Sequence, residues 1–542
     1  MMAPATLHSH SFSAPNKTTN QEDSLRRLRL AVYAYILLWI LEGALRKWIL
    51  PGLSAPLLIV RDPVLIYIYF EAFRLKVFKL NGYILFMLVL STLSIIVSLG
   101  LFKAPPLKVI AFGIRANFLH LPFIFLIPQI LTYSDVKKIG RIIVWLAPPM
   151  ALLTAWQFLS PSGARINVGA GGEGKMIETA FDRIRPSGTF SFTNGLAEYT
   201  VLLAAFLFHH LLEKNVFQKL AFLLAAPALL ILVVMSGSRT TFALVGLEIL
   251  TVFIIWFIKP RFAKSSMKVF AIAAAVIFII GSVGALRIGM DVIAARFSTS
   301  GGLKEGFLIR LLDEFKKPIV ASANAEIGGV GIGMGTNVAS SMMYNMLRFN
   351  LGESEMDRII MEMGPYLGLP YLLWRFAVVF LIARMALVAL RLHNNTLPLF
   401  LATACAYDLA MGQFGQSTVL GFAVMSAGLA LASTRRREEE ELIGLQESQN
   451  DLKKPFPMDP RNKSPLPSSI SIPSPYAEML RNEIEYIPPN SLPTVTNKAN
   501  SRNIRKPVAV TAPKVKPKTN KVSPAQKITS NKAVAKNIKT SK

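Results

Sequence analysis

Residues 83–102 read YILFMLVLSTLSIIVSLGLF and contain no charged side chain. An α-helix needs about 20 predominantly apolar residues to cross the hydrocarbon core of a bilayer, so this stretch predicts a transmembrane helix. Residues 217–235 (FQKLAFLLAAPALLILVVM) and 268–286 (KVFAIAAAVIFIIGSVGAL) come close to the same length and composition. Because such stretches recur along the chain, the sequence predicts a membrane protein with many spans.

The composition of the chain agrees with a membrane location. Of its 542 residues, 52% are hydrophobic and 17% are charged, whereas soluble domains carry about 25% charged residues. The N-terminal stretch is polar and the first apolar run has no small-residue cleavage site, so we expect that run to stay in the membrane. The single cysteine, Cys405, can form neither an internal disulfide nor a cysteine metal cluster. We expect no metal and no cofactor.

The length criterion predicts an all-α, polytopic transmembrane bundle of about 12 spans. These spans are expected near 29–45, 54–73, 83–102, 106–131, 139–159, 192–212, 217–235, 240–258, 268–288, 364–390, 396–412 and 416–433. The chain then divides into a flexible N-terminal segment (1–28), a transmembrane domain (29–434) and a basic C-terminal tail (435–542).

Basic residues in the connections predict how the bundle lies in the membrane. The stretches LRRLR, FRLKVFK, DVKKIGR, EKNVFQK, KPRFAKSSMK, RLHNN and TRRR fall on alternate connections, and LRKW after the first span is the exception. By the positive-inside rule, these connections and both termini are expected in the cytoplasm, with the spans in a bacterial inner (plasma) membrane. Two long segments, about 160–191 and 289–357, are then expected outside, on the face where a bundle often carries its function.

The net charge of +27 does not indicate a nucleic-acid partner, because much of the excess lies near the C-terminus. Residues 505–542 (RKPVAVTAPKVKPKTNKVSPAQKITSNKAVAKNIKTSK) contain no acidic side chain. Such a segment cannot bury enough apolar surface to fold, so we expect a disordered cytoplasmic tail. Its charge would hold it against anionic membrane lipid.

Two glycine-rich stretches superficially match nucleotide-binding motifs. GAGGEGKM (169–176) departs from a P-loop because Met176 replaces the hydroxyl that would hold magnesium, and no buried strand precedes it. GGVGIGMGTN, which begins at Gly328, lacks the strand and helix that would complete a dinucleotide pocket. We therefore expect a flexible loop at the first stretch and a close-packed turn at the second.

Several charged side chains are expected at or near the outer ends of spans, where an unpaired charge is costly. The stretch VVMSGSRTTFALVGLEIL sets Arg239 between two apolar runs, and RIRPSGTFSFTNGLAEY sets Arg185 before a span whose start carries Asn194. Arg115 lies within another span, while Arg183 is expected to be a snorkelling anchor. A guanidinium at such a depth is kept mainly when it binds something, so Arg239, Arg185 and Arg115 are candidate anion-binding residues.

Two further groups of charged residues lie close together in the sequence, and a solvated helix end would be the simplest explanation of the first. In the stretch ESEMDRIIMEMGPYLGL, Glu355, Arg358 and Glu362 are spaced by three and four residues and share one helical face. Glu362 would lie near the membrane boundary, where an unpaired acid is disfavoured. In the span near 54–73, the adjacent residues Arg61 and Asp62 are expected to form a neutral pair.

Four of these stretches occur in an order that resembles the O-antigen ligase and polymerase superfamily of membrane glycosyltransferases. They are RPSGTFSFTNGLAEYTVLL, SGSRTTFALVGL, GGVGIGMGTN and ESEMDRIIMEMGPYLGL. The resemblance extends from about Arg185 to Gly368, roughly a third of the chain. It rests on the order, the spacing and the common outer face of four short motifs.

The resemblance implies an enzyme that takes a glycan from an undecaprenyl diphosphate carrier and transfers it to an acceptor sugar at the outer face, in surface polysaccharide synthesis. Arg185 and Arg239 correspond to the family's diphosphate-holding arginines, and guanidinium groups can stabilise a departing diphosphate without a metal. Ligases carry a histidine eleven residues before the glycine that corresponds to Gly364, and this chain has Glu353 there. The general base is therefore expected to be Glu353 or Glu355.

Arg239 is thus expected to act in binding and in catalysis, and Arg115, Asn194 and Arg358 complete the candidate substrate-binding set. Both a polymerase and a ligase remain open, because the ligase histidine is replaced. The main alternative is a small-anion transporter, since arginine and glutamate inside spans would also serve an ion pathway. The chain lacks the internal repeat on which many transporters are built. A third alternative is a non-catalytic membrane scaffold that binds through its basic tail.

Overall fold

The computed structural model describes residues 17–101, 104–172, 177–213, 219–263, 267, 284–298, 308–336, 339 and 354–435. Within these ranges the chain is helical and forms no strand beyond an isolated bridge between Glu178 and Ile184. The longer helices are α1 (Lys17–Ala44), α3 (Arg61–Arg74), α4 (Gly82–Gly100), α5 (Leu107–Ile114), α6 (Phe123–Ile130), α7 (Tyr133–Leu159), α8 (Thr193–Leu212), α9 (Lys219–Met235), α10 (Arg239–Ile258), α12 (Gly284–Ser298), α13 (Leu308–Asn324), α15 (Glu355–His393), α16 (Leu397–Met411) and α17 (Ser417–Ser433).

Short helical pieces connect these helices. They are a π-helical turn at Leu45–Ile49, a 3₁₀ turn at Pro51–Leu53, α2 at Ser54–Leu57, a second π-helical turn at Arg115–Leu119, and 3₁₀ turns at Arg165–Asn167 and Ala180–Asp182. π-Helical turns are rare and occur frequently at functional sites. Both of them carry basic side chains: Arg46 and Lys47 in the first and Arg115 in the second.

The all-helical fold is confirmed for the described residues, and its apolar helices are compatible with a multi-pass membrane protein, but the expected number of about 12 spans is not confirmed. Seven helices of the described ranges are long and apolar enough to cross a membrane, and α5 with its π-turn and α6 form a further candidate span that is bent by 46°. The expected spans 217–235, 396–412 and 416–433 correspond to apolar helices of 17 residues or fewer. At 1.5 Å per residue such helices are about 25 Å long, less than the roughly 30 Å of a hydrocarbon core. The expected span 268–288 lies mostly outside the described residues.

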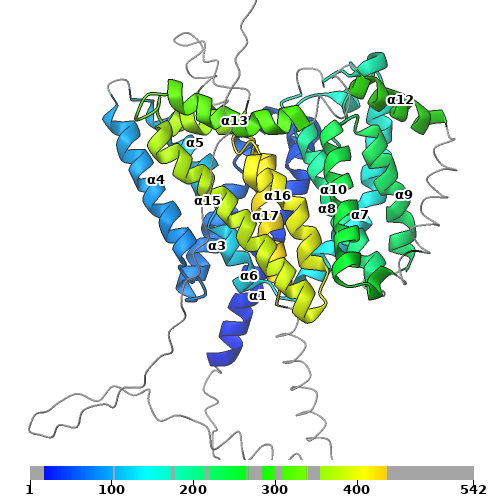
Figure 1. The fold of residues 1–542 in the computed structure, drawn as a ribbon, viewed down its shortest axis with the longest axis horizontal. Coiled ribbons are helices and arrows are strands. Elements are labelled where there is room, and N and C mark those ends of the chain that lie inside the picture. The colour runs from blue at the N-terminus through cyan, green and yellow to red at the C-terminus, as the bar shows by residue number, and fades with distance from the viewer. Residues whose placement is uncertain are drawn as a thin grey trace, which may run out of the picture. The chain divides into compact units, whose positions relative to one another are not determined.

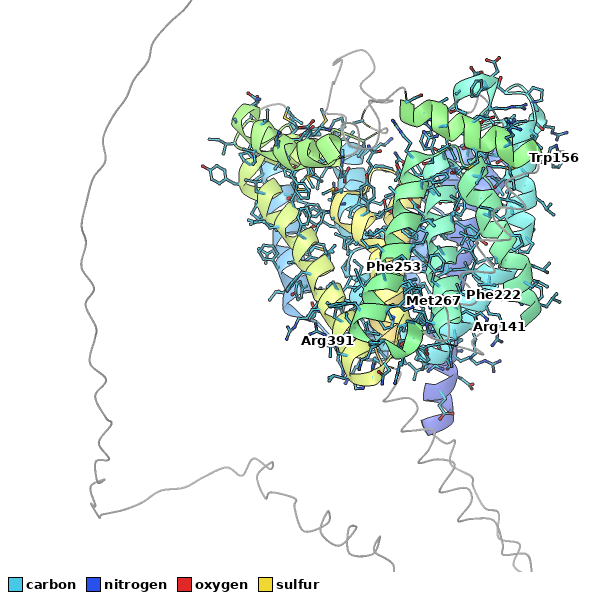
Figure 2. The ribbon with its side chains drawn as sticks, turned by 45° about the vertical axis from the view of Figure 1, so that its right-hand side comes forward. Arg141, Trp156, Phe222, Phe253, Met267 and Arg391 are labelled. Carbon is cyan, nitrogen blue, oxygen red and sulfur yellow. The ribbon has the colours of Figure 1, made fainter. Side chains whose placement is uncertain are left out.

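Contacts between loops that are distant in the sequence define the two ends of the bundle. At one end the backbone N–H of Gly171 donates to the carbonyl oxygen of Arg46 at 3.0 Å. At the other end Lys259 donates to the carbonyl oxygen of Arg391 at 2.9 Å. Figure 2 shows Trp156 at the end opposite to Arg391. We call the end that carries Arg46 and Trp156 the outer face and the end that carries Arg391 the inner face, following the predicted orientation.

The most buried helices lie in the middle of the bundle. Every residue of α17 is buried, and so is nearly all of α8. Figure 1 shows α16 and α17 between α15 on one side and α8 and α10 on the other, and α16 contacts α8, α10, α15 and α17. Helices at the periphery carry exposed apolar side chains, such as Phe253 on α10 and Phe380 on α15, which is the pattern expected of a surface that faces lipid.

The two long segments expected outside contain more structure than loops. Residues 177–185 form a small hairpin, closed by hydrogen bonds from the backbone N–H of Arg185 to Ile177 and from that of Thr179 to Arg183. The segment 289–357 contains the end of α12 and all of α13. Much of GAGGEGKM (169–176) and, apart from Arg435, all of the expected tail (435–542) lie outside the described residues.

We expect Gly172 to lie outside the cell and Asn394, in the turn between α15 and α16, to lie in the cytoplasm. Alkaline phosphatase is active only when exported, so a fusion at Gly172 should be active and one at Asn394 should not. Green fluorescent protein fusions at the same positions should give the reverse pattern. An active phosphatase at Asn394 together with fluorescence at Gly172 would overturn the predicted orientation.

Candidate functional site

The hairpin at 177–185 places Arg185 at the outer face. Its turn uses Phe181 and Asp182 with positive φ, and the chain after Arg185 is held by buried polar contacts. The side-chain amide of Gln157 accepts a hydrogen bond from the N–H of Gly188 at 2.8 Å. Lys47, on the first π-turn, donates to the carbonyl oxygen of Gly188 at 2.6 Å. The stretch that follows Arg185 is therefore anchored to two spans, which fixes where the arginine emerges.

The SGSR turn places Arg239 at the first position of α10. Gly237 has a positive φ of 55°, which glycine adopts at little cost because it has no Cβ. The hydroxyl of Ser238 caps the helix by accepting a hydrogen bond from the N–H of Thr241 at 3.4 Å. Arg239 therefore extends from a helix N-terminus, where the helix dipole adds to its positive charge.

The structure brings Arg185 and Arg239 together and adds a third arginine, Arg296 of α12. The Cγ of Arg185 lies 3.9 Å from the position that a Cβ would take at Gly237. Arg296 donates to the carbonyl oxygen of Gly237, and Arg239 donates to that of Arg296 at 3.3 Å. We call Arg185, Arg239 and Arg296 the arginine cluster.

Electrostatics within the arginine cluster favours an anion. Burial first, and then the positive charges of Arg296 and Arg239, lower the pKa of Arg185 to about 10. Burial and the charge of Arg239 also lower the pKa of Arg296. The Nε of Arg185 is buried without a hydrogen-bond partner among the described residues. Three guanidinium groups that repel one another at the end of a helix would gain free energy from a bound phosphate or diphosphate.

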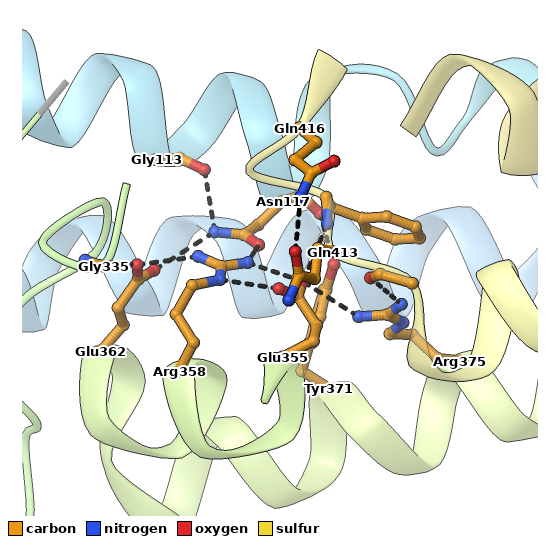
Figure 3. Close-up of polar contacts among 12 residues, drawn as sticks. Gly113, Asn117, Gly335, Glu355, Arg358, Glu362, Tyr371, Arg375, Gln413 and Gln416 are labelled. Atoms are coloured by element: carbon orange, nitrogen blue, oxygen red, sulfur yellow. Dashed lines mark hydrogen bonds and ion pairs between the residues drawn. The ribbon is translucent and has the colours of Figure 1, made fainter. Parts of the chain in front are cut away.

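Glu355, Arg358 and Glu362 form a second, separate polar network at the start of α15, which Figure 3 shows. Arg358 binds Glu355 with two parallel hydrogen bonds, Nη2 to Oε1 at 2.7 Å and Nε to Oε2 at 2.8 Å. Its Nη1 donates to Oε1 of Glu362 at 2.7 Å, and its Nη2 also donates to Asn117 of the second π-turn at 2.8 Å. All these side chains are buried, so the three charged residues do share one helical face, and they form ion pairs there instead of a solvated helix end.

The glycine-rich stretch GGVGIGMGTN holds the carboxylate of Glu362. The backbone N–H groups of Gly333 and Gly335 donate to this carboxylate at 3.1 and 2.8 Å. Gly364 breaks α15 with a positive φ of 71°, and a Cβ there would lie 2.1 Å from the carbonyl oxygen of Ile327. The expected close-packed turn is therefore present, and its N–H groups bind a side-chain carboxylate of the chain itself.

The connection between α16 and α17 links the first motif with the second network. Asn194 donates to the side-chain oxygen of Gln416 at 3.1 Å, and two residues earlier the N–H of Phe414 donates to Glu355 at 3.2 Å. Arg375 also donates to Glu355, at 3.3 Å. The carboxylate of Glu355 thus accepts hydrogen bonds from two arginines and a backbone N–H. In this arrangement Glu355 is a structural partner, and its predicted role as a base stays a prediction.

The other expected site residues are placed as follows. Arg115 forms an ion pair with Asp62, with its Nε 2.5 Å from Oδ2, and lies with the buried charges of the bundle rather than with the arginine cluster. Glu353 lies outside the described residues, so its predicted role as a base stays a prediction. Arg183 donates to the carbonyl oxygen of Leu159 at the outer end of α7, as suits an anchor.

The sequence patterns did not indicate Arg296 or Gln416, and they placed Arg375 inside a span without indicating a role for it. Arg296 follows an apolar run that the structure describes only from Gly284, and no motif marks it. Arg375 lies inside a long apolar span, where a buried arginine needs an acidic partner nearby. This need for an acidic partner could have indicated Glu355.

No protein-family model, curated protein or solved structure matches the chain.

Proposed function

We propose that the chain is a membrane glycosyltransferase that transfers a glycan from an undecaprenyl diphosphate carrier to an acceptor sugar at the outer face. The observation that supports this proposal best is the arginine cluster. Arg185 and Arg239 come from two motifs separated by about 50 residues, yet the Arg185 side chain reaches the turn at Gly237 and Arg239 donates to Arg296, which bonds the same turn. A polyprenyl diphosphate is an anion held at a membrane surface, so its natural binding site is a group of cations at the end of spans.

The chemistry of such a transfer suits guanidinium groups. The acceptor hydroxyl attacks the anomeric carbon while the bond from that carbon to the diphosphate oxygen breaks, and the electron pair leaves with the diphosphate. The acceptor proton must pass to a base, for which Glu353 is the candidate. Arginine forks beside a bound diphosphate would stabilise the charge that develops on it as it leaves. Asn194, close to this region in sequence, would act in positioning.

A small-anion transporter is less well supported by the charges inside the bundle. Arg61 pairs with Glu42, Arg115 pairs with Asp62, and Arg375 pairs with Glu355. A conducted anion needs cations along its path, and these arginines already have acidic partners. The arginine cluster lies at the outer end of α10 and so suits capture of an anion at the surface.

Deletion of the gene in the native cell tests the proposed function. We expect surface polysaccharide to be shortened or absent and carrier-linked glycan to accumulate in the membrane. Single repeats on the carrier would identify a polymerase, and finished polymer on the carrier would identify a ligase. Unchanged polysaccharide and unchanged carrier-linked glycan would refute the proposal, and altered anion uptake in the same cells would support transport instead.

Inorganic pyrophosphate is expected to bind the arginine cluster of the purified full-length protein. Binding to the folded state alone raises the unfolding temperature, so pyrophosphate should raise it in the wild type and raise it much less in Arg296→Gln. Arg183→Gln is the matched control, because Arg183 lies two residues from Arg185 but points to Leu159. Equal shifts in all three proteins would show that pyrophosphate does not bind at the cluster.

A further inference from the structure

Helix α13 runs across the outer ends of neighbouring helices instead of along them, as Figure 1 shows. It packs against α15, and the ring of Phe315 lies nearly parallel to the ring of Phe376 with centroids 6.0 Å apart. Pro318 and Ala321 lie on the side of α13 that faces the protein, where Pro318 is buried. The helix is therefore held on the bundle along one side.

The remaining sides of α13 differ in polarity, with the exposed Lys316 and Val320 at the boundary between them. Phe315, Ile319 and Ala323 follow one another at intervals of four residues and so share one face. Phe315 is 46% exposed and Ile319 is 70% exposed. Asp313, Lys317 and Asn324 fall on another side of the helix. A helix with one protein-facing, one apolar and one polar side is typical of the boundary between lipid and water.

The apolar side of α13 is continuous with a surface that already faces lipid. α15 is a candidate membrane span, and its Leu373 and Phe380 are 68% and 72% exposed. Phe376 lies between these two residues in sequence and contacts Phe315. The exposed apolar face of α13 thus begins where the lipid-facing flank of α15 ends.

We propose that α13 is an interfacial helix whose Phe315, Ile319 and Ala323 side lies in the outer leaflet of the membrane while its Asp313, Lys317 and Asn324 side faces water. The partner of this surface is the lipid of the same membrane. The inference does not depend on the proposed glycosyltransferase activity. It implies that the lipid surface helps to position the chain that leads from α13 into the glycine-rich turn around Glu362.

Spin labels at single cysteines test this proposal in the full-length protein in lipid nanodiscs. The chain has one native cysteine, Cys405, which is buried and can be replaced by alanine or left in place if the replacement lowers the yield. Labels are introduced by Ile319→Cys and Asn324→Cys, with Leu373→Cys as the lipid-facing reference on α15. Collisions with molecular oxygen report lipid, and collisions with a water-soluble nickel chelate report water.

The label at residue 319 should collide with oxygen at least several-fold more than with nickel, as at residue 373, and the label at residue 324 should show the reverse. A nickel-accessible label at residue 319 would overturn the proposal in favour of a water-facing helix. Low accessibility to both reagents at residue 319 would overturn it in favour of a protein partner over this face.

Discussion

Replacement of Arg239 by lysine is expected to lower the rate of glycan transfer roughly 100-fold while the amount of protein in the membrane stays unchanged. Lysine keeps the positive charge but loses the planar fork that binds two phosphate oxygens at once. Arg239 is the first residue of α10 and is only partly buried, so a lysine fits there without repacking the core. The loss should therefore lie in the transfer step.

The measurement is transfer of labelled glycan from a purified carrier-linked donor, with the protein in nanodiscs. Arg183→Lys is the control, because Arg183 lies near the same surface but bonds the end of α7. We expect this control to transfer at the wild-type rate. If Arg239→Lys transfers glycan at the wild-type rate, the assignment of Arg239 to the site is wrong. A stable, inserted Arg183→Lys protein that loses activity to the same extent would show that general surface charge, and not the fork, matters.

Some of the arginine cluster was predictable from the sequence. Arg185 and Arg239 were expected together because each stands beside an apolar run at the outer end of a span and each lies in a family-like motif. The sequence did not predict that Arg296 joins them, because the position of α12 relative to the SGSR turn depends on packing that no local pattern encodes. The third arginine follows only from contacts such as the hydrogen bond to Gly237.

The expected neutral pair of Arg61 and Asp62 was wrong, and helix geometry explains why. Adjacent residues on a helix point about 100° apart, so neighbours in sequence do not face each other. Arg61 instead pairs with Glu42 of α1, with 3.4 Å between Nε and Oε2, and Asp62 pairs with Arg115. Glu355, Arg358 and Glu362 do share the expected helical face, and they pair there because a spacing of three and four residues brings side chains together.

The expected number of spans was not confirmed, for a related reason. Hydropathy measures the length of an apolar run, but α16 and α17 are buried on nearly all sides by other helices. A helix that contacts protein instead of lipid can be apolar over its whole length without matching the thickness of the membrane. Composition alone cannot separate such a core helix from a full span.

Replacement of Arg358 by methionine is expected to lower the free energy of unfolding by about 3–5 kcal/mol, because it leaves the buried carboxylates of Glu355 and Glu362 without their shared arginine. Unfolding of the purified protein in detergent measures this loss. Arg391→Met is the control on the same helix, since Arg391 is exposed at the inner face, and we expect its stability to remain close to wild type.

The same variant decides between two roles for Arg358. If Arg358 binds the substrate, as the motif predicts, Arg358→Met should fold normally and lose carrier binding. If Arg358 neutralises the network, the protein should be unstable, and Glu355→Gln with Glu362→Gln in the same chain should restore part of the stability by removing both unpaired charges. The four hydrogen bonds that Arg358 already donates to Glu355, Glu362 and Asn117 favour the second outcome. A stable Arg358→Met protein with normal unfolding would instead support substrate binding by Arg358.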